Sequence, residues 1–81
     1  MVTTLEIVKA YINSSHGWAV ADQFEDTFLG QSFEKQNYNA LKYIHGAVLE
    51  LVDDSEVLSD SAIDELQSYL DDLEIYLAKN S

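Results

Sequence analysis

The sequence predicts an all-α fold: a small bundle of about four helices, the last two forming an antiparallel hairpin. Apolar residues recur at intervals of three and four in four segments, the period of amphipathic helices. Turn residues separate these segments, and the chain contains no proline. With 81 residues the chain can build only a simple core, so we expect a single helical domain over residues 1–81.

The first two helices are predicted from their ends. Thr3 and Glu6 have the spacing of a capping box, so a first helix begins there and ends in the turn residues 13–17. A second helix is expected from Gly17 to Leu29. Gly30 is expected to end it, because glycine readily adopts the left-handed conformation of a helix C-cap.

The third and longest helix is expected to run from Phe33 to Val52, with Ser32 as its N-cap. The acidic residues that follow Val52 break the apolar period. Val57 and Leu58 are then expected to form one buried turn in the connection to the final helix.

The final helix is expected to be capped by Ser59 or Ser61 and to end near Lys79. Its apolar seam has helical spacing and consists of Ile63, Leu66, Leu70, Leu73 and Leu77. The first two helices would pack across the hairpin formed by the last two, which would bury every apolar stripe of the chain.

The composition narrows the choice of partners. The net charge is −11 and the chain has no arginine, which argues against binding to nucleic acid or to an anionic membrane and favours a basic protein. Without cysteine, a secreted disulfide scaffold is not expected, and no stretch resembles an export signal or a membrane span. We therefore expect a cytoplasmic protein. The alternative interpretation of the acidity is that it serves solubility alone.

No catalytic, cofactor or metal site is expected. His45 lies among apolar stripe residues, where a hydrogen-bonded core or boundary histidine is the simpler interpretation, and His16 lies in a turn. Serine, His16 and Asp22 supply the residue types of a hydrolytic triad without a nucleophile elbow. The acidic connection from Asp53 to Asp64 lacks the glycine and the terminal glutamate of a calcium loop. We therefore expect a protein that is not an enzyme.

Ten of the fifteen carboxylates lie between Glu50 and Glu74, a stretch without lysine or arginine. On the final helix several of them fall opposite the seam, together with Ile75, whose apolar side chain is either a core or dimer contact or the centre of a binding patch. Carboxylates near the end of the third helix are disfavoured there by the helix dipole. The predicted partner-binding residues are Glu50, Asp53, Asp54, Glu56, Asp60, Asp64, Glu65, Asp71, Asp72, Glu74 and Ile75.

The segment Phe24-Glu25-Asp26-Thr27-Phe28-Leu29-Gly30 resembles a segment of ArdA-type antirestriction proteins, which carry a Phe-Glu-acid-small-aromatic-x-Gly run in a very acidic chain. Those proteins mimic the charge of duplex DNA and occupy DNA-binding sites on restriction enzymes. The similarity covers seven residues and transfers no functional residue. It implies a DNA-mimic type of function.

These observations predict a small acidic inhibitor that binds a basic, nucleic-acid-binding protein, with carboxylates in place of phosphates. Counter-defence proteins of phages or mobile elements, such as antirestriction or anti-CRISPR proteins, use this strategy, as do toxin-immunity proteins. The alternative is a homo-oligomeric structural or assembly protein. In that case Trp18, Tyr43, Tyr69, Ile75 and Tyr76 would form a homodimer or larger interface.

Overall fold

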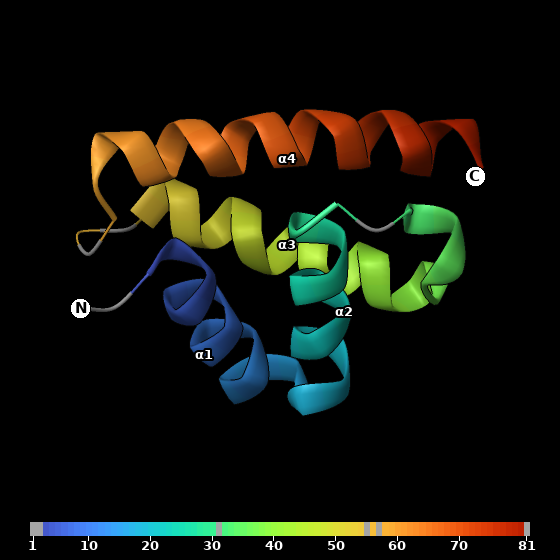
Figure 1. The fold of residues 1–81 in the computed structure, drawn as a ribbon, viewed down its shortest axis with the longest axis horizontal. Helices are drawn as coiled ribbons and strands as arrows, with labels where there is room; N and C mark the ends of the chain where they lie inside the picture. The colour runs from blue at the N-terminus through green and yellow to red at the C-terminus, as the bar shows by residue number, and fades with distance from the viewer. Residues whose placement is uncertain (1–2, 31, 55, 57, 81) are drawn as a thin grey trace.

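Within the described residues, the fold consists of four α-helices and one short 3-10 turn (Figure 1). A computed structural model describes residues 3–30, 32–54, 56 and 58–80, and these described residues contain no β-strand. In chain order the elements are α1 (Thr4–His16), α2 (Trp18–Phe28), η1 (Phe33–Lys35), α3 (Tyr38–Asp54) and α4 (Asp60–Lys79). The predicted all-α class with about four helices is confirmed.

The helices α3 and α4 lie side by side and run in opposite directions, as the hairpin prediction requires (Figure 1). The helices α1 and α2 meet at Gly17 and both pack against α3. The C-terminal end of α2 also reaches α4, where the Thr27 and Tyr69 hydroxyl oxygens lie 2.7 Å apart. In Figure 1, α4 is the outermost element at the top, opposite the corner between α1 and α2.

One hydrophobic cluster joins all four helices, and most of its members have no solvent-exposed surface. Burying each such side chain stabilises the fold by about 1.5–3 kcal/mol relative to leaving it in water. The seam predicted for α4 contributes its central residues to this cluster. The largest fully buried members are Val8, Ile12, Phe24, Leu41, Ile44, Val48, Leu66 and Leu73.

Two helix starts and one helix end follow the sequence signals. The Thr3 hydroxyl accepts a hydrogen bond from the Glu6 amide at 3.2 Å, and the Glu6 carboxylate accepts one from the Thr3 amide at 3.4 Å, which completes the capping box. The Ser59 hydroxyl accepts from the Ala62 amide at 3.2 Å and caps α4. Gly30 has φ +110°, the positive value expected where α2 ends.

The predicted bounds of the other helices need correction. The α1 helix continues through residues 13–16 and ends only where Gly17 turns the chain at φ +93°. Ser32 caps the 3-10 turn η1 and not α3, because its hydroxyl accepts from the Glu34 amide. The side chain of Asn37 accepts from the amides of residues 39 and 40, so α3 begins at Tyr38.

The connection between α3 and α4 is shorter than expected, because α3 continues two residues past Val52 to Asp54. Leu58 is partly buried against the core. Val57, predicted to share a buried turn with it, lies outside the described residues.

Candidate partner-binding surface

All eleven residues predicted to bind a partner are exposed. They belong to the end of α3, the connection and α4, and we call them together the acidic surface. Because α3, the connection and α4 follow one another in the chain, these eleven residues lie along the hairpin and around its turn (Figure 1). Exposure is the property that a binding surface needs, and equally the one that a solubilising surface has.

Six carboxylates of the acidic surface belong to α4, from Asp60 to Glu74. At a rise of 1.5 Å per residue these fourteen steps span about 21 Å, so the mean spacing is about 4 Å of axis per charge. Duplex DNA carries one phosphate per about 3.4 Å of axis on each strand. The linear charge density of α4 therefore approaches that of one DNA strand.

The carboxylates of α4 divide between two sides of the helix. Two hollows lie beside α4, and each contains carboxylates of the acidic surface. The first, of about 400 Å³, is bordered by Glu65 and Asp72 and lies against the end of α2 and η1. The second, of about 280 Å³, lies between α3 and α4 and contains Asp53, Asp71 and Glu74 beside apolar side chains.

The end of α3 is a poor place for negative charge. Asp53 and Asp54 are exposed in the last turn of α3, which contains no basic residue. The helix dipole disfavours an anion there by about 0.3–1 kcal/mol each. Neither aspartate caps the next helix, since Ser59 does so. The stability of the fold therefore gives no reason for these two charges.

Glu50, one turn earlier on α3, has a partner within the protein. Its carboxylate accepts a hydrogen bond from the Tyr11 hydroxyl at 3.0 Å. This bond raises the pKa of Tyr11, with the nearby charge of Asp54 adding to the effect. Glu50 thus helps to hold α1 against α3 and is less available to a partner than the prediction assumed.

Few cations neutralise the acidic surface. Among the described residues, its one ion pair joins the His45 ring to Glu74 at 3.0 Å, and it depends on the protonation of the histidine. His45 is thus a hydrogen-bonded boundary residue, as predicted. Lys9 instead pairs with Glu25 at 3.0 Å on α2, and this hydrogen bond raises the pKa of the lysine.

Of the other three lysines, Lys42 near the start of α3 and Lys79 at the end of α4 lie at the end of the hairpin opposite the connection, and Lys35 lies in η1. Lys42 lies 5.8 Å from the ring centroid of Tyr38, whose hydroxyl donates to the carbonyl of Leu77. Lys79 lies in the last turn of α4. The acidic surface is therefore most negative near the α3–α4 connection and weakens toward the C-terminal end of α4, so it can orient a charged partner.

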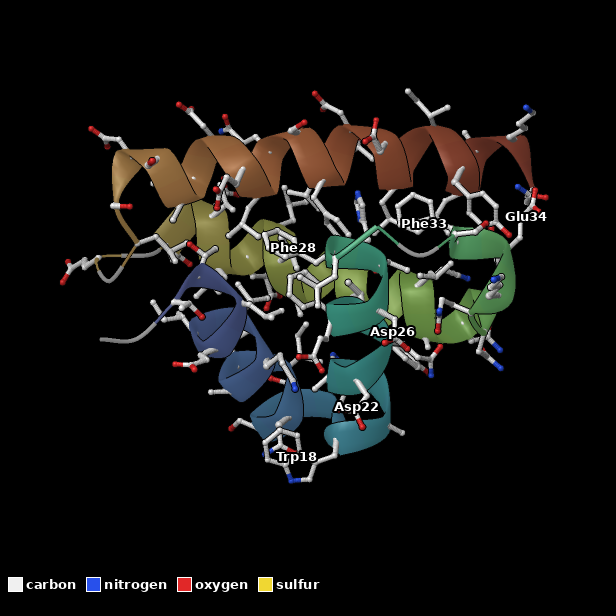
Figure 2. The ribbon with its side chains drawn as sticks, in the orientation of Figure 1. Trp18, Asp22, Asp26, Phe28, Phe33 and Glu34 are labelled. Carbon is white, nitrogen blue, oxygen red and sulfur yellow. The ribbon has the colours of Figure 1, made fainter. Side chains whose placement is uncertain are left out.

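The aromatic residues proposed for a homodimer interface do not form one patch. Tyr69 is 7% exposed and packs edge-on against Phe24, so it is too buried for the homodimer contact expected of it. Tyr76 is half-buried and its ring lies 5.5 Å from that of Phe33. Trp18 is exposed, but it lies at the corner of α1 and α2, far from α4 (Figure 2).

Ile75 is the apolar side chain that the structure leaves in solvent within the acidic surface. It is 67% exposed, which excludes the core-coverage interpretation. It shares the outward side of α4 with Asp64 and Asp71, at spacings of eleven and four residues. An exposed isoleucine among carboxylates fits the apolar centre of a binding patch.

Sequence reasoning missed the residues that build the first hollow. Phe28 and Phe33 flank Gly30 in the chain, and the turn between them places both rings beside α4 (Figure 2). Ser68 lies on the same side of α4 as Glu65 and Asp72, between them in the sequence. The available signal was a pair of phenylalanines around a glycine that ends a helix.

Neither a metal-binding cluster nor a membrane-spanning helix is found in the described part of the chain. There, no group of three or more histidine, aspartate or glutamate side chains is placed to hold a metal ion. The described helices include none that is long and apolar enough to cross a membrane. The His16 ring stacks on the Tyr43 ring with centroids 4.9 Å apart.

No protein family, curated protein or solved structure matches this chain. The similarity of residues 24–30 to antirestriction proteins stays a prediction. Within this fold those residues have packing roles: Phe24 is fully buried, Thr27 bonds to Tyr69, and Phe28 stacks on Phe24 at 5.2 Å.

Proposed function

We propose that the protein is a non-enzymatic inhibitor that binds a basic, nucleic-acid-binding protein through the acidic surface. The observation that carries this proposal is the set of exposed carboxylates around α4, with a mean spacing of about 4 Å of axis per charge. A binding site for DNA phosphates contains lysine and arginine at comparable intervals, so the two surfaces are complementary.

Two further features support binding over solubility. Asp53 and Asp54 occupy a helix end where their charge lowers stability, which a merely solubilising surface could avoid. Ile75 supplies an exposed apolar contact at the C-terminal edge of the charged face, where its desolvation on binding adds affinity. The function in a cell would be to keep the partner from its nucleic acid, as counter-defence proteins of phages and toxin-immunity proteins do.

The test removes charge from α4 without changing the fold. In the site variant, Asp64, Asp71 and Asp72 are replaced by asparagine; these side chains are exposed. In the control variant, Asp22→Asn, Asp26→Asn and Glu34→Gln change the net charge equally on α2 and η1 (Figure 2). Each protein is used to capture partners from lysate of the source cell or its host, with elution in steps of salt.

The proposal predicts one basic protein retained by the wild type and the control variant, released between low and moderate salt. The site variant should lose it or release it at lower salt, because three of the charges that attract the partner are gone. Equal retention by the site variant would show that the acidic surface is not the binding site.

A further inference from the structure

The first hollow beside α4 has a different character from the rest of the acidic surface. It has a volume of about 400 Å³ and lies where the end of α2 and the turn η1 meet α4. Figure 2 shows Phe28 at the end of α2 and Phe33 near α4, both on the side of α4 that faces the rest of the fold. The hollow thus combines a side of the acidic helix with rings from another part of the chain.

Three aromatic rings form part of the wall. The centroids of Phe28 and Phe33 each lie 5.9 Å from that of Tyr69, at interplanar angles of 57° and 69°. The Tyr69 hydroxyl is already engaged by Thr27 at 2.7 Å, so Tyr69 offers its ring rather than a free polar group. Because Tyr69 is only 7% exposed, an occupant stacks mainly on the half-buried rings of Phe28 and Phe33.

Two carboxylates border the same hollow. Glu65 and Asp72 are seven residues apart on α4, about 10.5 Å along the helix axis, with Ser68 between them. Both are exposed, and no lysine lines the hollow. The combination of aromatic rings with uncompensated negative charge selects for an organic cation: an anion would be repelled, and a neutral apolar group would desolvate the carboxylates without pairing them.

Among protein side chains, arginine suits this combination best. Its guanidinium group is planar, is more weakly hydrated than the lysine ammonium, and can stack on a ring while its N–H groups donate to carboxylates. None of these 81 residues is an arginine, so none of them can occupy the hollow in this way. We propose that the hollow receives one arginine side chain of the basic partner, between the rings of Phe28, Phe33 and Tyr69 and the carboxylates of Glu65 and Asp72.

That the arginine belongs to a basic partner rests on the proposed function. The preference of the hollow for a guanidinium group does not, and it can be tested on the protein alone. The probe is N-acetyl-arginine amide, compared with the lysine analogue and with the citrulline analogue, which is nearly isosteric and neutral. Each is titrated into protein labelled for NMR, and the aromatic resonances of Phe28, Phe33 and Tyr69 are followed. Saturable shifts are expected with arginine, weaker ones with lysine and none with citrulline.

Matched variants locate the response. Glu65→Gln with Asp72→Asn should raise the apparent dissociation constant for the arginine probe about two- to thirtyfold, the range expected for losing two exposed charge pairs. Asp53→Asn with Asp71→Asn removes the same charge around the second hollow and should leave the aromatic shifts unchanged. Phe33→Leu keeps an apolar side chain but should weaken arginine binding by removing one ring.

Equal shifts with arginine and citrulline, or equal loss in both pairs of charge variants, would overturn the guanidinium site. That result would leave the capture experiment on α4 interpretable, since two of its three substituted aspartates, Asp64 and Asp71, lie outside this hollow. Conversely, an arginine response in a protein that captures no basic partner would keep the site and overturn the proposed function.

Discussion

The two aspartates on either side of the α3–α4 connection offer a sharp test of why the acidic surface is placed as it is. Asp54 is the last residue of α3 and Asp60 the first of α4, so the same charge lies at opposite ends of two helix dipoles. Asp54→Asn should stabilise the protein by about 0.3–1 kcal/mol, and Asp60→Asn should destabilise it by a similar amount. Asparagine and aspartate have similar helix propensities, so the substitutions differ chiefly in the charge they remove.

Urea denaturation at low salt measures this difference. The two effects together separate the variants by about 0.6–2 kcal/mol, and with a slope of about 1 kcal/mol per molar urea their midpoints should differ by about 0.6–2 M. Relief of the net charge of −11 acts on both variants alike and cancels in the comparison. High salt should reduce the difference because both side chains are exposed.

Equal shifts in the same direction would refute this reasoning. They would mean that net charge, and not position on the helix, governs the effect. The carboxylates at the end of α3 would then carry no stability cost specific to their position, and the inference that they are kept there for binding would fail.

Three other outcomes follow from the structure. Burial raises the pKa of Tyr69 to about 12, so the folded protein favours the neutral phenol. The contribution of this group to the free energy of unfolding is complete below pH 10 and should decline by roughly 2–3 kcal/mol between pH 10 and 12. Urea unfolding at these pH values should show that decline in the wild type relative to Tyr69→Phe, and parallel curves would contradict it. Phe24→Ala should cost about 3–5 kcal/mol in the same assay, because the ring is fully buried among other rings; a loss below 1 kcal/mol would show that the site is loosely packed. Sedimentation should give a 9.1 kDa monomer at low salt, since a symmetric contact through Ile75 would bring two acidic surfaces together; a dimer abolished by Ile75→Asp would support the assembly alternative.

Local signals predicted those parts of the fold that local interactions determine. The capping box of Thr3 and Glu6 and the cap at Ser59 involve groups within three residues of each other. The start of α3 was misplaced because it depends on a distant contact. The Asn37 amide donates to the Gln23 side chain on α2 at 3.0 Å, which fixes Asn37 as the cap and leaves Ser32 to the 3-10 turn.

The candidate site was predictable in its exposure and not in its shape. Periodicity places the carboxylates of α4 away from its apolar seam, and the structure leaves them exposed. Tyr69 lies at the edge of that seam, where its burial depends on what packs over it. Here the end of α2 does so through Phe24 and Thr27, and the hollow beside α4 arises from that same packing.

The most direct test of the central claim is competition between this protein and nucleic acid for the captured partner. The immobilised protein is loaded with the partner and then washed with a short DNA duplex at constant ionic strength. If the acidic surface occupies a nucleic-acid-binding site of the partner, the duplex should release the partner. The variant with Asp64, Asp71 and Asp72 replaced by asparagine should bind little of the partner in the first place. A partner that binds the duplex while still held by the protein would contradict the account.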